Sequence, residues 1–118
     1  MTESIGVDII EIDRVAEIIS EFGEKFLKKV FSDEEIRYCL SKAKPSQHFA
    51  ARFAAKEAVI KALGTGFGKG IMLKDIEIRN DVNGKPKVFY KGNSTEKILI
   101  SISHCNHYVV AFALLKID

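Results

Sequence analysis

The sequence predicts an α+β domain with a largely antiparallel sheet. Three observations support this fold class: helix-like segments precede four strand-like segments, these strands follow one another without intervening helices, and Asn83-Gly84 joins two of them. An Asn-Gly pair between strands favours a tight hairpin, and consecutive strands linked by hairpins pair antiparallel. At 118 residues, we expect a single domain over residues 1–118.

The chain is expected to begin with a strand and an amphipathic helix. Residues 5–12 are rich in β-branched side chains, which favours a strand. Asp13 is a good N-cap, and apolar residues then recur at helical spacing. We therefore expect a helix over about residues 13–29, with a bend at Gly23.

Two further helices are expected next. Ser32 can cap the first of them, and Glu35, three residues later, completes a capping box for a helix that ends near Lys42. The second spans residues 47–63, which are rich in alanine and carry a broad apolar stripe. We expect it to end at Gly64, because glycine readily adopts the backbone conformation of helix C-termini.

The rest of the chain is predicted to form a glycine-rich loop and four strands. The loop covers residues 64–70. The first hairpin joins strands over 75–81 and 87–91, and the second joins strands over 98–104 and 108–115.

The composition argues against nucleic-acid and membrane partners. The net charge of +2 is too small to indicate nucleic-acid binding, and no apolar run approaches the roughly 18 residues of a membrane helix. Cys39 and Cys105 follow no disulfide pattern and residues 1–8 show no signal peptide, so we expect a cytoplasmic protein. A domain of this size buries only about two thirds of its unfolded surface, which favours self-association.

Asp8 is an unusual residue within the first strand. Alternation puts it on the same face as Gly6 and Ile10, whereas Val7 and Ile9 take the other face. Since both faces are apolar, we expect the strand to be covered on both sides. A buried carboxylate without a partner is costly, so Asp8 either holds a cation, caps a neighbouring helix or lies at the exposed end of the strand.

A second candidate group lies on the alanine-rich helix. Phe53, Glu57 and Lys61 share one face at i, i+4 spacing, and Arg52 and Lys56 share the adjacent stripe. The surrounding alanines favour close approach by another element, which would place these charges in a cleft. The alternative is a solvated Glu–Lys pair worth about 0.3–0.5 kcal/mol.

The glycine-rich loop matches no standard nucleotide motif. A dinucleotide fingerprint would need glycine at Lys69, and a Walker A loop would need Ser or Thr at Gly70. Its glycines can still turn backbone N–H groups toward a phosphate. An ordinary helix terminator followed by a mobile loop explains them equally well.

The predicted strand over 98–104 ends in polar residues. Ser101 and Ser103 share one face, and His104 lies on the other. A Ser–His nucleophile would need a third orienting group, and a zinc site with Cys105 and His107 would need a fourth ligand. An anion contact by His104 is the better functional interpretation, and a hydrogen-bonded turn is the structural alternative.

Taken together, these residues favour phosphate chemistry. Carboxylates without nitrogen or sulfur ligands suit Mg²⁺, which commonly takes one or two carboxylates plus substrate phosphates. The combination fits a pyrophosphate substrate better than acyl or hydride chemistry. The residues concerned are Asp8, Glu57, Arg52, Lys56, Lys61, Lys85 and His104.

Several stretches resemble a known family in their order along the chain, from about residue 5 to 115. They are Gly6-Val7-Asp8-Ile9, Phe31-Ser32-Asp33-Glu34-Glu35, Arg52-Phe53-Ala54-Ala55-Lys56-Glu57-Ala58, Lys61-Ala62-Leu63-Gly64-Thr65-Gly66, Asn83-Gly84-Lys85-Pro86 and Ser101-Ile102-Ser103-His104. The chain resembles the holo-[acyl-carrier-protein] synthases, the small single-domain class of 4′-phosphopantetheinyl transferases. This resemblance implies a largely antiparallel sheet packed on a long central helix, and a homotrimer with active sites between neighbouring subunits.

The resemblance also implies a reaction. Such enzymes move the 4′-phosphopantetheine arm of coenzyme A onto a serine of apo-acyl carrier protein, in support of fatty acid biosynthesis, and adenosine 3′,5′-bisphosphate leaves. By matching position, Asp8 and Glu57 are similar to the Mg²⁺ ligands, and Lys61 to the residue that meets the reacting phosphate. The positions that resemble contacts of the nucleotide half of coenzyme A are Arg52, Lys56, Gly64, Thr65, Gly66, Lys85, Pro86, Ser103 and His104.

Two aspects of the implied mechanism stay open. Either Glu57 or a metal-bound water near Asp8 is the base that deprotonates the carrier serine. Arg14 matches the family position for carrier docking, but Glu17, Glu21 and Glu24 interrupt the basic face expected for an acidic partner. Docking then relies on Arg14 together with a shifted basic patch at Lys25, Lys28 and Lys29, or on apolar contacts.

Two other functions fit parts of the pattern. One is a Mg²⁺-dependent hydrolase of a nucleotide pyrophosphate, although the chain lacks the extra carboxylates that water activation commonly recruits. The other is a binding module for coenzyme A or a nucleotide, or a structural subunit, for which Asp8, Glu57 and Lys61 would have no joint use. Turnover in the presence and absence of a chelator separates enzymes from binders.

Overall fold

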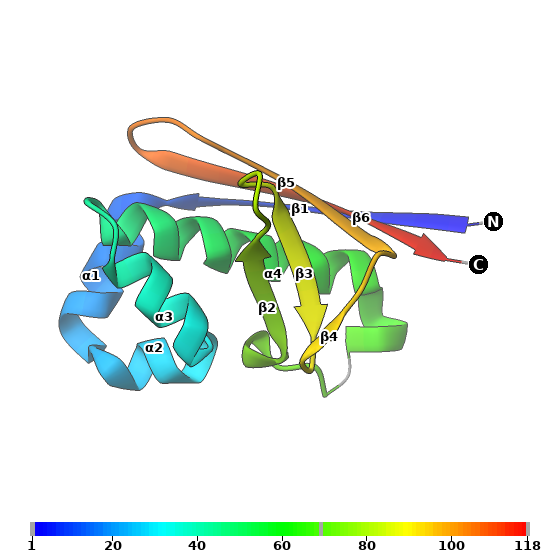
Figure 1. The fold of residues 1–118 in the computed structure, drawn as a ribbon, viewed down its shortest axis with the longest axis horizontal. Coiled ribbons are helices and arrows are strands. Elements are labelled where there is room, and N and C mark those ends of the chain that lie inside the picture. Colours follow the sequence, from blue (N-terminus) through cyan, green and yellow to red (C-terminus); the bar gives the residue numbers. More distant parts are fainter. Residues whose placement is uncertain (1, 69, 118) are drawn as a thin grey trace.

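The computed structural model describes residues 2–68 and 70–117, with side chains over 3–64 and 70–116. Its elements follow the chain in the order β1 (Thr2–Glu11), α1 (Ile12–Phe22), α2 (Glu24–Val30), α3 (Asp33–Leu40), α4 (Pro45–Gly68), a short 3₁₀ helix η1 (Leu73–Asp75), β2 (Ile76–Asn80), β3 (Pro86–Tyr90), β4 (Asn93–Ser94), β5 (Ile98–His104) and β6 (Tyr108–Ile117). Figure 1 shows the arrangement.

The strands form two antiparallel three-stranded sheets. In the first sheet the order is β1-β6-β5, and in the second it is β2-β3-β4. The α+β prediction with antiparallel pairing is therefore confirmed, although the strands divide between two sheets instead of forming one. The longest pairing joins β1 to β6 along ten residues, from Thr2 opposite Ile117 to Glu11 opposite Tyr108.

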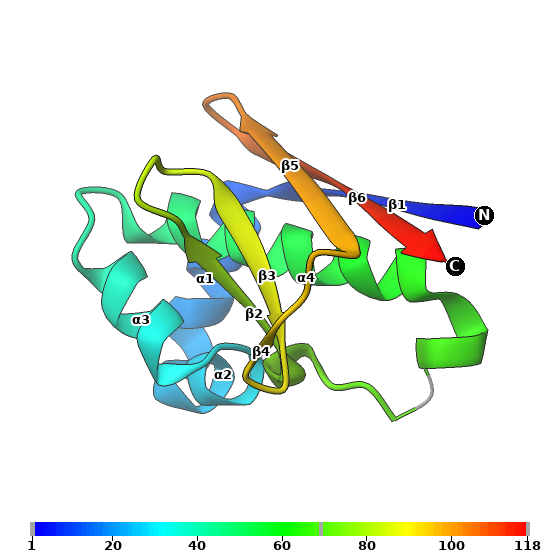
Figure 2. The same ribbon diagram turned by 45° about the vertical axis from the view of Figure 1, so that its right-hand side comes forward.

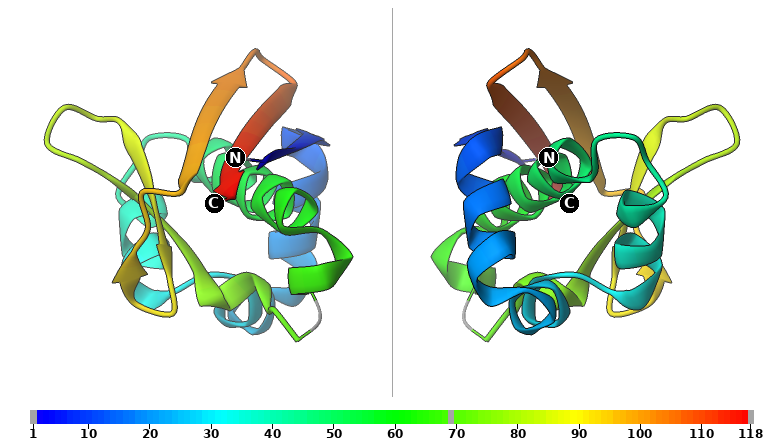
Figure 3. Two further views of the ribbon diagram at one scale, coloured as in Figure 1. Left: turned by 90° about the vertical axis from the view of Figure 1, so that its right-hand side faces the viewer. Right: turned by 90° about the vertical axis from the view of Figure 1, so that its left-hand side faces the viewer.

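Helix α4 is the centre of the molecule. It runs beneath the first sheet, with α1 and α2 to one side and the second sheet to the other (Figure 3). Ala54, Ala58 and Ala62 are buried along its length, and these small side chains let β1 approach closely. A Cβ on Gly6 would lie 2.1 Å from the carbonyl oxygen of Ala58, so only glycine fits at this crossing.

The first predicted helix is two helices in the structure. Gly23 has φ +57° and ψ −136°, a conformation that side-chain-bearing residues rarely adopt, and α1 ends there while α2 begins. The next boundary agrees with the prediction. Ser32 Oγ accepts a hydrogen bond from the Glu35 backbone N–H at 3.2 Å, and the Ser32 N–H donates to Glu35 Oε1 at 2.9 Å, which completes the capping box.

The glycine-rich segment is more helical than predicted. Gly64 interrupts α4 with φ +70° and ψ −176°, as expected of a helix terminator, but a further helical turn then follows to Gly68. The prediction of a plain loop from Gly64 onward is therefore wrong for this turn. A left-handed residue breaks the hydrogen-bond ladder locally, and the chain after it is free to start a new turn. Lys69 lies outside the described residues.

The first sheet is covered on one face only. Its inner face packs on α4, whereas the outer face of the single chain is open, so the prediction that β1 is covered on both sides is wrong for one chain. The side chains of Ile5, Val7 and Ile9 are 61%, 52% and 65% exposed. We call the outer apolar face the set of exposed large apolar residues on this side: Ile5, Val7, Ile9, Leu99, Tyr108, Val110 and Phe112.

Candidate active site

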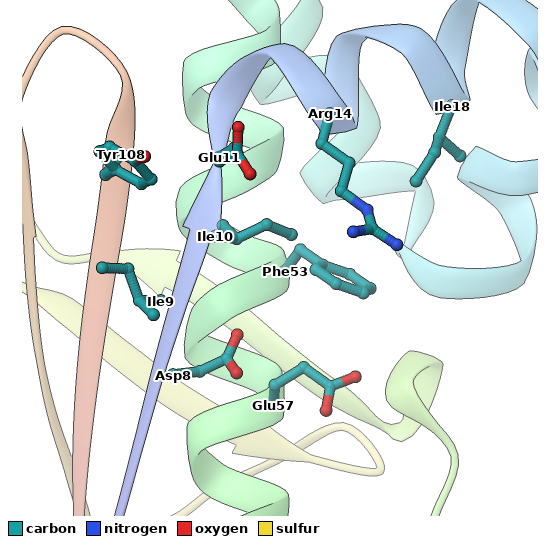
Figure 4. Close-up of a pocket in the computed structure, with 9 residues that line it drawn as sticks. All are labelled: Asp8, Ile9, Ile10, Glu11, Arg14, Ile18, Phe53, Glu57 and Tyr108. Atoms are coloured by element: carbon teal, nitrogen blue, oxygen red, sulfur yellow. The ribbon is translucent and has the colours of Figure 1, made fainter.

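A pocket opens where β1, α1 and α4 meet, beside the edge of the first sheet. Figure 4 shows the Asp8 and Glu57 carboxylates on the two sides of this opening and the Arg14 guanidinium above them. The pocket has a volume of about 430 Å³. It is lined by Asp8, Ile9, Ile10, Glu11, Arg14, Ile18, Phe53, Glu57 and Tyr108.

The two carboxylates are brought together by backbone packing. Asp8 lies on the inner face of β1, two residues after Gly6, whose contact with α4 sets the spacing between strand and helix. Glu57 comes from the part of α4 that faces this strand, next to Ala58. The predicted juxtaposition of Asp8 and Glu57 is therefore present in the structure.

Lys61 provides the nearest positive charge. Its Nζ lies 3.1 Å from Asp8 Oδ1 and donates a second hydrogen bond to the Val7 carbonyl at 3.0 Å. The Lys61 side chain is 54% exposed and that of Asp8 is 18% exposed. A Glu57–Lys61 pair along the helix was the alternative interpretation of the sequence, but the direct partner of Lys61 is Asp8 on the neighbouring strand.

Burial and the neighbouring charges together disfavour a negative charge on the Glu57 carboxyl group. Burial raises the pKa of the Glu57 carboxyl, and the Asp8 carboxylate raises it further, while Lys61 acts in the opposite direction. Two carboxylates that share a pocket with too little positive charge make a site that attracts a cation. Arg14, on the first turn of α1, adds one positive charge at the rim.

Protein groups alone would not complete a metal site here. Among residues 2–68 and 70–117, no three His, Cys, Asp or Glu side chains converge as a ligand cluster. Two carboxylates match what Mg²⁺ takes from a protein when substrate phosphates and water supply the other oxygens. The donor set of Asp8 and Glu57 therefore fits a magnesium ion bound together with a phosphorylated substrate.

A second cluster of positive charge lies nearer the start of α4, around Arg52. The Arg52 side chain is only 4% exposed, and its Cζ lies 4.1 Å from the centre of the Tyr38 ring. Its Nε is buried and has no hydrogen-bond partner within the described part of the chain. Lys42 and His48 also contact the Tyr38 ring. Burial and the positive charges of Arg52, Lys42 and His104 lower the pKa of His48.

The other residues predicted to contact coenzyme A lie on several separate elements of the fold. His104 ends β5, where its Nε2 is 3.3 Å from Gln47 Nε2, near the start of α4. Ser103 is exposed on the opposite side of β5, as alternation predicted. Lys85 and Pro86 lie at the end of the β2–β3 hairpin. Gly64 is at the interruption in α4, and the structure does not describe the side chains of the predicted contacts Thr65 and Gly66.

The Lys56 side chain reaches neither the Asp8–Glu57 pocket nor the cluster around Arg52. Its side chain is 0% exposed, and its Nζ lies 2.7 Å from Glu35 Oε1 in the core. Sequence reasoning placed Lys56 on a charged helix stripe beside a cleft and treated Glu35 only as a helix cap. It also missed Tyr38 and His48. No local pattern marked these residues, because their contacts connect segments far apart in the sequence.

The sequence model of the 4′-phosphopantetheinyl transferase superfamily matches residues 4–113. The chain belongs to this superfamily. Among its curated relatives is the holo-[acyl-carrier-protein] synthase of Protochlamydia amoebophila, which is 54% identical over 97% of this chain and 98% of that protein.

Solved structures of phosphopantetheinyl transferases agree with the fold. A holo-(acyl-carrier-protein) synthase from Bacillus anthracis in complex with CoA (3′,5′-ADP) is 37% identical and superposes with a TM-score of 0.82, covering 98% of this chain and 96% of that one. The enzyme from Helicobacter pylori in complex with coenzyme A is 32% identical, with a TM-score of 0.81, covering 95% and 99%. The resemblance seen in the sequence motifs is thus confirmed over nearly the whole chain.

Proposed function

We propose that this protein transfers the 4′-phosphopantetheine arm of coenzyme A to a serine of apo-acyl carrier protein, in support of fatty acid biosynthesis. The products are holo-acyl carrier protein and adenosine 3′,5′-bisphosphate. The observation that carries the proposal is the pocket in which Asp8 and Glu57 meet beside Lys61, in a chain of the phosphopantetheinyl transferase superfamily. Relatives named as holo-[acyl-carrier-protein] synthases support the substrate and the carrier.

Asp8 and Glu57 are the proposed ligands of Mg²⁺. When bound, the ion offsets negative charge on the pyrophosphate and on the leaving group. Lys61, held beside Asp8, places a second positive charge where the reacting phosphate would lie. Two groups can take the proton from the carrier serine: the Glu57 carboxylate, or a water held near Asp8.

The Arg52 cluster is the proposed site for the nucleotide half of coenzyme A. Its buried and unpartnered Nε, with Lys42 and His48 around the same Tyr38 ring, suits an anionic group that accepts hydrogen bonds. We propose that Gly64, Thr65, Gly66, Lys85, Pro86, Ser103 and His104 line the rest of this ligand's path. We leave Lys56 out of this set, since its ammonium is enclosed in the core.

A homotrimer with active sites between subunits is part of the proposal. Ile9 and Tyr108 both line the Asp8–Glu57 pocket and belong to the outer apolar face, so a second copy packed on this face would border the pocket. Ser103 lies on the outer side of β5 and faces away from α4 of its own chain. A ligand that touches both Ser103 and Glu57 would therefore have to contact two subunits.

The proposed carrier surface combines Arg14 with apolar side chains of α1. Ile18 lines the pocket next to Arg14, and Phe22 is 54% exposed one turn further along. Glu17 and Glu21 lie exposed on the same helix, which weakens attraction to an acidic carrier. We therefore favour Arg14 with apolar contacts over a patch that is only basic.

We also propose a cytoplasmic location, where the carrier would be met. Cys39 is buried, Cys105 is exposed, and neither forms a disulfide, as expected in a reducing compartment. Among the described helices, none has the length and apolar content needed to cross a membrane.

Intact-protein mass spectrometry tests the proposed reaction. A purified apo-acyl carrier protein is incubated with this protein, coenzyme A and Mg²⁺, with and without a chelator. We expect a mass gain of one phosphopantetheine arm that the chelator abolishes. Coenzyme A binding without a mass gain on several carriers would contradict the proposal and indicate a binding module instead.

A further inference from the structure

A fully buried ion pair lies next to the proposed active site. Lys56 Nζ and Glu35 Oε1 are 2.7 Å apart, and both side chains are 0% exposed. Taking two charges out of water costs several kcal/mol for each ion, so such a pair persists only where its remaining hydrogen-bonding groups are also satisfied.

Every hydrogen of the Lys56 ammonium has a partner. Besides Glu35, the Nζ donates to the Val30 carbonyl at 2.9 Å and to the Leu73 carbonyl at 3.1 Å. An ammonium has three N–H donors and no acceptor, so no donor is left for a substrate. Lys56 is therefore occupied by the fold itself.

Glu35 is equally engaged. Its Oε1 also accepts the Ser32 backbone N–H at 2.9 Å, and its Oε2 accepts the Ile78 backbone N–H at 2.9 Å. The pair thus ties together the end of α2, the start of α3, the middle of α4, η1 and β2. Figure 2 shows these elements gathered around the middle of α4.

The position of this pair determines where Glu57 points. Successive residues of an α-helix are turned by about 100°, so a fixed Lys56 leaves Glu57 little freedom to rotate about the helix axis. Lys56 is held toward α2, α3 and η1, and Glu57 then faces the pocket with Asp8. The bond to Leu73 also fixes the chain where it returns after the glycine-rich segment 64–70.

We infer that Glu35 and Lys56 are positioning residues that hold α4 in the rotation that presents Glu57 to Asp8, and that Lys56 does not contact coenzyme A. The inference rests on the proposed function for the identity of the site. The family resemblance implied that Lys56 contacts coenzyme A. The positioning role takes the place of that contact.

A double-mutant cycle on unfolding tests the pair. Lys56→Met, Glu35→Gln and the double variant are unfolded with urea. Removing one partner leaves the other charge buried, so we expect each single variant to lower the folding equilibrium constant by about two orders of magnitude or more. We expect the loss in the double variant to be at least about tenfold smaller than the product of the single losses.

The chain contains a control ion pair on α3, the helix that carries Glu35. Arg37 and Glu34 form an exposed ion pair at 3.4 Å, with side chains 72% and 62% exposed. Arg37→Met, Glu34→Gln and their combination are expected to change the equilibrium constant by less than about threefold. If Lys56→Met does not fold, the size-compensated variants Glu35→Asp and Lys56→Arg take its place in the cycle.

Kinetics separate positioning from substrate contact. Under conditions where each variant is folded, we expect Glu35→Gln and Lys56→Met to lower kcat about tenfold or more while KM for coenzyme A stays within about threefold. A purely structural pair would leave kcat of the folded fraction unchanged, and that result would overturn the inference. A rise in KM with Lys56→Met alone would overturn it too, since that pattern indicates a direct contact.

If the proposed transferase function is wrong, the same experiments give a different result. The parent protein would then show no transfer to any carrier, while the unfolding cycle would still report on the Glu35–Lys56 pair. Coenzyme A affinity, measured by calorimetry, then takes the place of KM. The effects of the two substitutions on unfolding could instead be additive while the parent protein transfers the phosphopantetheine arm. That result contradicts the positioning role and leaves the transferase assignment intact.

Discussion

Glu57 lies in surroundings that favour the neutral form of its carboxyl group. Burial and the neighbouring Asp8 both raise the pKa of its carboxyl. A group whose folded-state pKa lies above its unfolded value destabilises the fold at pH values above both. This cost shrinks as the pH falls below the folded-state pKa and is gone below the unfolded-state pKa. Keeping two carboxylates together in this pocket therefore lowers the free energy of unfolding at neutral pH.

This cost predicts the behaviour of two variants. Glu57→Gln and Asp8→Asn should each lower kcat by about 100-fold or more, because each removes a proposed metal ligand. Neither should lower the melting temperature, and Glu57→Gln should raise it at neutral pH. Calorimetry from pH 8 downward checks the cause: the advantage of Glu57→Gln should shrink on acidification and vanish once Glu57 is protonated in both the folded and the unfolded parent. Full activity of both variants at limiting Mg²⁺ would contradict the metal assignment.

Arg52 combines a stacked guanidinium with an unpartnered buried Nε. Lysine would keep the charge but lose the planar stack on Tyr38 and the fork of donors. We expect Arg52→Lys to raise KM for coenzyme A about tenfold or more while kcat stays within about threefold. Steady-state kinetics with coenzyme A as the varied substrate measure this split. Exposed Arg37→Lys is the control, and equal KM values for the two variants would remove Arg52 from the ligand site.

Individual residues could be predicted where chemistry and local pattern agreed. Asp8 stood out as a carboxylate in an apolar strand, and Glu57 as a charge among alanines. The role of Lys56 could not be found in this way, because its partner Glu35 is 21 positions earlier. The sequence marked Lys56 as part of a charged stripe and Glu35 as part of a helix cap. Ion pairs between distant segments leave no periodic signal in one sequence.

At the scale of elements, the crossing of β1 over α4 decides the geometry of the site. Gly6 has no room for a side chain, since its Cβ would also lie 2.7 Å from the Ala62 amide nitrogen and 3.0 Å from Lys61 Cβ. Backbone atoms cannot swing aside as a flexible side chain can. Any larger residue at this position must therefore separate the strand from the helix.

Gly6→Ala tests the importance of this contact. We expect a loss of about 3 kcal/mol in the free energy of unfolding, at the upper end of over-packing costs, measured by urea unfolding. Transfer activity of the folded fraction should fall as well, because Asp8 moves away from Glu57. Glu3→Ala on the exposed part of β1 should change neither quantity. A variant Gly6→Ala with parental activity would show that the spacing between the carboxylates is not critical.

Element boundaries were predictable to the extent that local signals set them. The capping box at Ser32 and the hairpin at Asn83-Gly84 are local and were found. The separation of α1 from α2 was foreseen only as a bend, since a glycine signals a change of direction but not its angle. The division of the strands into two sheets follows from packing on both sides of α4, which no single segment encodes.

The whole molecule has an apolar surface that one chain does not cover. Phe112 is 42% exposed at the centre of the outer apolar face, on the middle strand of the first sheet. Contiguous exposed apolar surface of this kind usually marks an interface. We therefore expect a mass of about 40 kDa in solution, three times the 13.2 kDa chain.

Phe112→Asp should give monomers that remain folded, since this side chain already contacts solvent in the single chain. Analytical ultracentrifugation measures the mass, and circular dichroism verifies the fold. Val82→Asp is the matched control, because Val82 is fully exposed between β2 and β3 and away from this face. If the parent itself sediments as a monomer, the shared-site proposal fails.

The pairing of Thr2 with Ile117 brings the two ends of the described chain side by side (Figure 1). Asp8 lies six residues further along β1, about 20 Å from this end at the usual rise of a strand. A short peptide bridge could therefore join these two ends within one chain without crossing the pocket. Such a bridge would close the molecule into a ring, and new ends could then be opened in an exposed loop away from the pocket.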